Sequence, residues 1–584
     1  MTIQDSNKLS KLYFYTGFLM VSILAATFLI SSLLFFIKIP MSPWQFPAGI
    51  LLACLLTFYF IRQNKEDAIN IYTLYGLSFG LLIFFLAIGS YFYDVSFDGQ
   101  AYHMEAMIQM KNGWNPFYEY LPATVNQSLW VNHYAKGMEV VATAIDCTLN
   151  NIEAGKAANF MLWAASFFFS LSFVIRNQWI PLWKAVILCF LIACNPIVLN
   201  QLLTYYVDGP MGALLLCLIV MGLYILQSPA TIYYVALALI VFLLVNVKFT
   251  AVLYIAIAVG GYLIWAIWKK KFLLAKRLWW TSVIAGIFAI LCGFNPYITN
   301  TVNFGHPLYP LMGKNKVDII YAINLPAGFE HKNGLERFVI AFFSRTDNIY
   351  PNSPYPVEMK IPFTFNKIDG AHAPMVDARL GGFGPMFSGV FILALVMAIL
   401  LYRDARKESV FRNITWLLAF IVISVIVMPE SWWARYVPQL WLFPILLLLA
   451  AEVLRRDRYK ILKACIYGSL VINLLFCSTG FFFNLLLTTE INYQLTLLKS
   501  SSQTIQLDLG ESKSNRIRFS ENNIPYKLSK FHRQAVSEQF KEEYMAGSQA
   551  CFIWPSNVDK NLKEPWLLKK AGRFLPFMWK YYGR

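Results

Sequence analysis

Five polar side chains suited to acid–base chemistry follow an apolar run that ends near residue 92. Asp94, Asp98, Tyr102, His103 and Glu105 lie in the stretch DVSFDGQAYHME. If this stretch is helical, Asp98 and Tyr102 are four residues apart and share one face, with His103 beside them. Two carboxylates with a neighbouring histidine and tyrosine suit general-base activation of a hydroxyl or amine, or metal binding. A simpler interpretation is that Asp98 caps the helix that follows it.

Two isolated cations, Lys248 and Arg435, stand at the ends of apolar runs far away in the sequence. Arg435 lies in the stretch WWARYVP, whose aromatic residues would hold it in place, and its guanidinium group matches the geometry of a phosphate. We predict that both cations bind an anionic part of a substrate. The alternative is that their side chains extend to the lipid headgroups.

Three further residues are predicted to bind substrate. Asp208, in TYYVDGP, is placed to bind a sugar or a cation, or else to favour the start of a helix. Tyr436 is the neighbour of Arg435. His306 lies between a glycine and a proline, where stabilising a turn is its simpler role. The metal ligands, if there are any, stay unknown, because the sequence has no His-x-x-x-His pair and no tight carboxylate cluster.

The elements that must position these residues are membrane spans. The chain is 58% hydrophobic and 14% charged, against roughly 25% charged residues in ordinary soluble proteins. Its apolar residues gather in runs of about 18 to 25, the length that crosses about 30 Å of hydrocarbon. The sequence therefore predicts an all-α polytopic membrane protein with about 13 transmembrane helices. The expected ranges are 13–37, 44–61, 71–92, 157–175, 181–199, 209–226, 231–246, 249–268, 279–298, 386–402, 413–428, 436–454 and 463–487.

The distribution of lysine and arginine predicts the orientation. With the N-terminus in the cytoplasm, the short connections on that side carry most of the cations, for example in residues 269–277 and 403–412. The short outer connections carry Lys38, Lys248 and Arg435, which is a clear positive-inside bias. Topology thus explains most of the net charge of +17, and no basic face of the kind that binds nucleic acid is apparent. We expect a bacterial inner membrane, with the large loops and the C-terminus outside the cytoplasm.

Long polar segments divide the chain into six parts. The parts are 1–93 with three spans, 94–156 as a first outer segment with the acidic residues, 157–299 with spans four to nine, 300–385 as a second outer segment, 386–487 with the last spans, and 488–584 as a C-terminal domain. We expect short surface helices in the first outer segment and little regular structure in the second. The C-terminal domain should be a small α/β fold. Its expected strands are 505–509, 515–519 and 550–554, and its expected helix covers 541–547.

Several of these stretches resemble the integral membrane glycosyltransferases of the GT-C superfamily, and most of all the bacterial relatives of the protein O-mannosyltransferase and aminoarabinose transferase group. The similar stretches are DGQAYH (98–103), GWNPFY (113–118), TYYVDGP (204–210), NVKFT (246–250), GFNPYITNTVNFGHPLYP (293–310), RLGGFGP (379–385) and WWARYVP (432–438). The resemblance implies transfer of a sugar from a polyprenyl-phosphate carrier to a glycan, lipid or protein of the cell envelope, with inversion at the anomeric carbon.

Roles for single residues follow from this resemblance. Asp98 or Asp94 would be the catalytic base; many members have adjacent acidic residues here, whereas these two are four apart, so the choice stays open. The cations would neutralise the departing lipid phosphate. The residues implied to bind substrate are Tyr102, His103, Asp208, Lys248, His306, Arg435 and Tyr436. Some members use a divalent cation such as Mg or Mn and others do not, and the sequence leaves that open.

Two other functions fit a protein of this composition. An O-antigen polymerase or ligase also has about a dozen helices and a large outer loop, but its working residues tend to be Arg and His in late loops. A transporter or flippase of lipid-linked saccharides would show ionisable residues in mid-span and inverted repeats. The predicted spans are almost free of charge in their interiors, which favours the enzyme.

Overall fold

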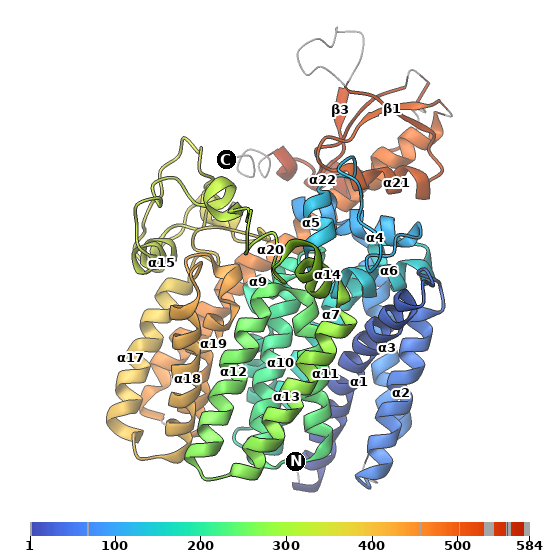
Figure 1. Ribbon diagram of the computed structural model, residues 1–584. Helices are drawn as coiled ribbons and strands as arrows, with labels where there is room; N and C mark the ends of the chain where they lie inside the picture. Colours follow the sequence, from blue (N-terminus) through green and yellow to red (C-terminus); the bar gives the residue numbers. More distant parts are fainter. Residues whose placement is uncertain are drawn as a thin grey trace.

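The computed structural model is a bundle of long helices with three smaller substructures gathered at one end (Figure 1). The described residues are 3–66, 69–454, 457–501, 503–530, 542–555, 557–558 and 562–576. The N-terminus lies at the opposite end of the bundle from the C-terminal domain (Figure 1). The three long polar segments therefore share one side, as the sequence predicts.

All thirteen predicted apolar runs form helices, and ten helices of the described chain are long and apolar enough to cross a membrane. These ten are α1 (Ile3–Phe36), α2 (Gln45–Gln63), α3 (Ile71–Tyr91), α7 (Ala157–Arg176), α10 (Asp208–Gln227), α12 (Phe249–Trp268), α13 (Phe272–Cys292), α17 (Phe387–Ala405), α18 (Ser409–Val427) and α20 (Lys460–Ser500). The shorter apolar helices are α8 (Leu182–Ala193), α11 (Thr231–Val247) and α19 (Leu442–Val453). The chain is thus a multi-span helical membrane protein.

Some helices begin or end away from their predicted limits. Helix α13 starts at Phe272 and ends at Cys292, whereas the predicted span was 279–298. Helix α20 continues to Ser500 as one rod of 41 residues, well past the predicted limit at 487. Helix α8 ends at Ala193, and a separate short helix, α9 (Pro196–Gln201), begins at Pro196 after the non-helical residue Asn195. Composition locates apolar runs, but backbone breaks and polar extensions set the true limits.

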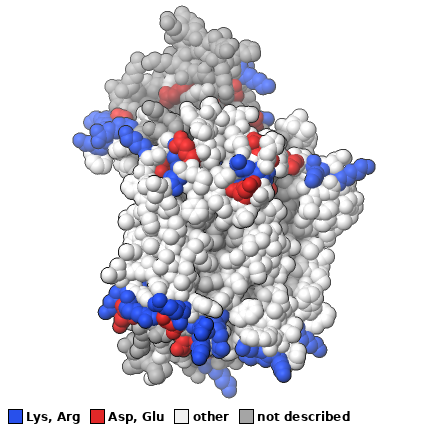
Figure 2. Space-filling view, turned by 90° about the vertical axis from the view of Figure 1, so that its left-hand side faces the viewer, with Lys and Arg blue, Asp and Glu red and all other residues white. Residues whose placement is uncertain are grey.

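The surface of the bundle shows a broad band without charge. Charged side chains gather at two levels, at the lower end and at the level of the outer segments, and uncharged atoms cover the belt between them (Figure 2). Large apolar side chains are exposed on the helices of this belt; they include Leu55, Ile83, Ile284, Ile399 and Leu475. Side chains of this kind are stable on the outside only against hydrocarbon, so this belt faces lipid.

The first outer segment is helical, as predicted. A π-helical turn (Gly99–His103) leads into α4 (Met104–Lys111), followed by α5 (Ser128–His133), α6 (Gly137–Leu149) and a 3-10 turn (Ile152–Lys156). The second outer segment has more regular structure than expected. It contains the end of α14 (Phe294–Phe304), then α15 (Gly334–Phe343) and α16 (Lys367–His372), and two isolated bridges join Ser344 to Met359 and Asp347 to Leu380.

The C-terminal domain contains a four-stranded sheet of order β2-β1-β4-β3. Its elements are β1 (Ile505–Asp508), α21 (Arg516–Glu521), β2 (Tyr526–Leu528), β3 (Glu542–Tyr544), β4 (Cys551–Ile553) and α22 (Trp566–Ala571). Strands β1 and β2 are parallel, and α21 lies in the crossover that a parallel pair requires. Two predictions were therefore wrong: 515–519 is mainly helix and 542–544 is strand. The contacts within the sheet and its crossover outweighed the local helix or strand preference of these two segments.

The C-terminal domain binds directly to the first outer segment. Gln100 donates a hydrogen bond to the Gly547 carbonyl at 2.7 Å and accepts one from Asn515 at 2.6 Å. Arg516 binds both carboxylate oxygens of Glu105, at 2.6 and 2.8 Å. These contacts fasten the π-helical turn to the C-terminal domain, which fixes the backbone that follows Asp98.

Candidate functional site

Asp98 directly precedes the π-helical turn, at the top of the bundle. A π-helical turn inserts one extra residue into a helix and redirects the side chains around it. The Tyr102 hydroxyl donates a hydrogen bond to Asp98 Oδ2 at 3.1 Å, so the predicted shared face of these residues is confirmed. Within the described chain, the Asp98 side chain makes no capping hydrogen bond, and the capping interpretation is wrong.

Asp208, Lys248 and Arg435 form a group of buried ion pairs. Arg435 Nη2 lies 2.8 Å from Asp208 Oδ2, and Lys248 Nζ donates a hydrogen bond to Asp208 Oδ1. The Asp208 carboxylate is completely buried, and the side chains of Lys248 and Arg435 are 18% and 11% exposed. Both cations therefore point into the protein and do not extend to lipid headgroups.

Three separate breaks in the helical structure bring these charges together. Asp208 is the first residue of α10. Lys248 is the single extended residue between α11 (Thr231–Val247) and α12 (Phe249–Trp268). Arg435 lies in a 3-10 turn (Ala434–Tyr436) between α18 and α19. Because each charge stands at a helix end, the interior of the bundle stays apolar.

Arg435 also joins this group to the acidic segment. Its Nη2 atom lies 3.8 Å from Asp98 Oδ2, so one guanidinium group stands between two carboxylates. Asp98, Asp208, Lys248 and Arg435 are called the charged cluster below. With all four groups ionised, its formal charge is zero, because two carboxylates face two cations.

Aromatic rings surround the two cations. Arg435 Cζ lies 4.9 Å from the ring centroids of both Tyr206 and Trp433. Lys248 Nζ lies 4.5 Å from the ring centroid of Tyr436. Such rings attract a cation by their quadrupole and exclude water. The predicted role of the WWARY stretch, which is to hold Arg435 still, matches this geometry.

Asp98 remains accessible although it is part of a largely buried cluster. Its side chain is 21% exposed. Burial raises the pKa of the Asp98 carboxyl, and the positive charge of Arg435 opposes that rise. A carboxylate with a raised pKa is a stronger proton acceptor, provided that the solution is basic enough to keep it ionised.

Asp94 lies apart from the charged cluster and is fully buried. Its Oδ1 accepts a hydrogen bond from the Ser96 N–H and its Oδ2 accepts one from the Tyr205 N–H, both at 2.7 Å. A Cβ atom on Gly99 would lie 2.0 Å from Asp94 Oδ2, which shows how closely the π-helical turn approaches it. With both oxygens occupied by backbone donors, Asp94 ties the acidic segment to the chain before α10.

The two predicted histidines do not join the charged cluster. His103 Nδ1 lies 2.6 Å from Glu139 Oε1, and its ring packs 4.2 Å from the Tyr102 ring. His103 therefore packs against the Tyr102 ring and lies outside the charged cluster. His306 Nδ1 accepts a hydrogen bond from the Leu308 N–H at 3.1 Å, as expected of a residue that stabilises a turn.

Lys136 is a buried cation that sequence reasoning missed. Its Nζ donates to the carbonyls of Asn132 and Tyr134, at 3.2 and 2.8 Å, and to the Asn295 side chain at 2.6 Å. Burial lowers the pKa of the Lys136 amine to about 7. The contact with Tyr134 matters because the Tyr134 ring packs edge-on against Tyr102. The sequence pattern that could have identified Lys136 is the one that identified Lys248, a single lysine on the outer side.

The described residues contain no group of three or more His, Cys, Asp or Glu placed to hold a metal ion.

Comparison of the chain with models of protein families, with curated proteins and with solved structures gave no match. The class of protein thus rests on the fold and the site. It is an integral membrane protein with about ten candidate spans, whose polar segments at one end enclose a charged cluster at the helix ends.

Proposed function

We propose that this protein is a glycosyltransferase that moves a sugar from a polyprenyl-phosphate donor to a glycan, lipid or protein acceptor of the cell envelope. The observation that carries the proposal is the 3.8 Å approach of Arg435 to Asp98. It brings a proton acceptor next to a cation at the end of a membrane-spanning bundle. Transfer from a lipid phosphate needs both kinds of group in one site, a base for the acceptor hydroxyl and a cation for the departing phosphate.

The proposed reaction is a direct displacement. Asp98 takes the proton of the acceptor hydroxyl, and the acceptor oxygen attacks the anomeric carbon as the bond from that carbon to the phosphate oxygen breaks. The electron pair of this bond leaves with the lipid phosphate, and the sugar inverts. Arg435 and Lys248 stabilise the negative charge that develops on the phosphate.

Asp208 has a positioning role in this proposal. It holds Arg435 and Lys248 in fixed positions before the donor binds, so no free energy is spent on ordering these side chains during the reaction. Arg435 Nε is buried and has no hydrogen-bond partner among the described residues. A phosphate oxygen is the acceptor that best suits this unused donor.

The test is transfer from a radiolabelled polyprenyl-phosphate sugar to membrane acceptors by the purified protein. We expect Asp98→Asn to lower the rate of transfer by about 10²- to 10⁴-fold, the usual contribution of a general base. Donor binding should persist, because Arg435 and Lys248 remain. The matched control is Asp318→Asn, an exposed carboxylate of the second outer segment. Equal transfer by wild type and Asp98→Asn would remove Asp98 as the base, and absence of any donor consumption would overturn the proposal.

The pH dependence gives a second test of the same assignment. Because burial raises the pKa of Asp98, its base form is lost at a higher pH than for an ordinary aspartate. Transfer should therefore fall as the pH drops through the pKa of Asp98 in the folded protein. A rate that stays constant down to the ordinary range of aspartate, near 3.9, would contradict the role of Asp98.

A further inference from the structure

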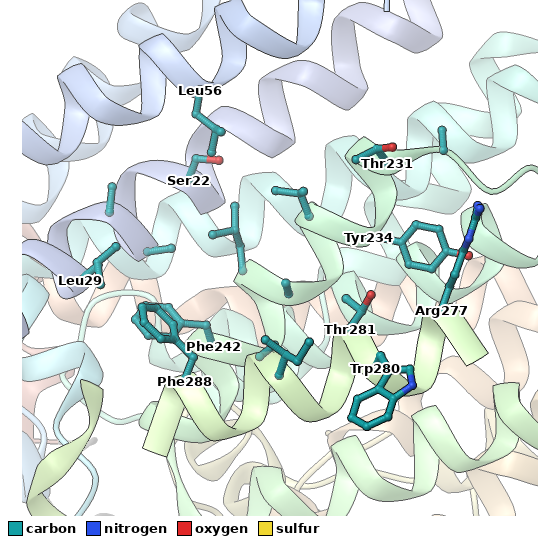
Figure 3. Close-up of a pocket in the computed structure, with 18 of the residues that line it drawn as sticks. Ser22, Leu29, Leu56, Thr231, Tyr234, Phe242, Arg277, Trp280, Thr281 and Phe288 are labelled. Atoms are coloured by element: carbon teal, nitrogen blue, oxygen red, sulfur yellow. The ribbon is translucent and has the colours of Figure 1, made fainter. Parts of the chain in front are cut away.

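A groove of about 980 Å³ opens into the side of the helix bundle, at the end away from the charged cluster. Its walls come from α1, α2, α11 and α13, which Figure 3 shows around the cavity. On α13 the lining runs from Leu273 to Phe288, or about 22 Å at 1.5 Å per residue. Since the hydrocarbon core is about 30 Å thick, the groove extends from the bundle end past the middle of the membrane.

Small side chains create the space. Alanines stand where larger residues would close the gap between the helices; they are Ala25, Ala26, Ala53, Ala238 and Ala285. Folded proteins fill their interiors to a density at which a gap of this size costs stability. Because the lining is mostly apolar, water is a poor occupant and hydrocarbon is a good one.

One end of the groove is positively charged. Lys276 and Arg277 line it near the start of α13, and both are exposed. Within the described chain, neither cation has a carboxylate within 4 Å. Arg277 lies beside Tyr234 and near Thr231 in Figure 3. The Tyr234 hydroxyl is buried and has no hydrogen-bond partner among the described residues, so it is available to an acceptor oxygen.

Two cations and a free hydroxyl above an apolar channel match one kind of molecule. We propose that this groove binds an anionic glycerophospholipid, with its phosphate on Lys276 and Arg277 and one acyl chain between the four helices. A phosphodiester oxygen accepts hydrogen bonds from Arg277 and Tyr234, and the second cation neutralises the remaining charge. The site is separate from the proposed donor site, and the inference does not depend on glycosyl transfer.

The test is native mass spectrometry of the full-length protein, released from nanodiscs that contain equal amounts of phosphatidylglycerol and phosphatidylcholine. We expect the wild type to retain phosphatidylglycerol about tenfold more than phosphatidylcholine. The double variant Lys276→Gln/Arg277→Gln should lose this preference. The matched control, Arg406→Gln/Lys407→Gln, removes the same two charge types from another exposed loop at the same end and should behave as wild type.

A second variant tests the chain-binding part separately. Ala238→Phe fills the groove from α11 and leaves both cations in place, so retention of phosphatidylglycerol should fall several-fold. Equal retention of the two lipids by wild type would overturn the proposal. Unchanged preference in Lys276→Gln/Arg277→Gln, or unchanged retention in Ala238→Phe, would overturn it as well, since the lipid would then be bound elsewhere.

Discussion

Removal of Asp208 gives a sharp test of the charged cluster, because this one carboxylate pairs with two cations. Asp208→Asn keeps the shape of the side chain and removes its charge. The formal charge of the cluster then changes from zero to +1, with Arg435 and Lys248 largely buried. Lys248→Met has the opposite effect and leaves the cluster at −1. The double variant returns the cluster to zero, with Asp98 and Arg435 still paired.

The geometry sets the size of the effect. At 2.8 Å, the Asp208–Arg435 pair has a Coulomb energy of about 6 kcal/mol for an effective dielectric constant near 20. Desolvation offsets part of this energy, and removing one partner of a buried pair typically costs about 3–5 kcal/mol. We therefore expect Asp208→Asn to lower the free energy of unfolding by about 3 kcal/mol. The double variant should be about 2 kcal/mol more stable than the sum of the single effects.

The assay is unfolding of the purified protein by sodium dodecyl sulfate in mixed micelles, followed by circular dichroism, for wild type, both single variants and the double variant. Asp318→Asn serves as the control for loss of an exposed carboxylate, and it should change the free energy by less than about 0.5 kcal/mol. If the two single effects add within about 0.5 kcal/mol, Asp208 and Lys248 do not interact, and the electrostatic reasoning is refuted.

Three other predictions concern residues around the site. Gly99→Ala places a Cβ 2.0 Å from the fixed carboxylate of Asp94, and should lower the unfolding free energy by about 2 kcal/mol; an unchanged midpoint would contradict this. Burial lowers the pKa of Lys136 from 10.5 to about 7, so between these pH values the unfolded chain keeps a proton on Lys136 that the folded protein has lost. The free energy of unfolding of the wild type should therefore rise from pH 7 to about 10.5, and this rise should vanish in Lys136→Met. Arg516→Met leaves the buried Glu105 without its bidentate partner, and limited proteolysis should release the C-terminal domain faster than in wild type.

The sequence by itself determined the class of protein and the arrangement of its polar parts. Runs of apolar residues are a local property, and each run can satisfy its backbone hydrogen bonds only as a helix within lipid. For this reason all thirteen runs became helices, and the three long polar segments lie at one end (Figure 1). The contact of Asp98 with Tyr102 was equally local, since it follows from a spacing of four residues.

The tertiary structure decided which charges meet. Asp94 and Asp98 look alike in the sequence, but backbone donors occupy both oxygens of Asp94, whereas Asp98 faces Arg435. Lys248 and Arg435 share Asp208 because distant breaks in the helices pack together. No local sequence pattern specifies that packing. The short strands of the C-terminal domain were misjudged for the same reason. Ion pairs and sheets join segments far apart in the chain, so their energies depend on packing and not on local preference.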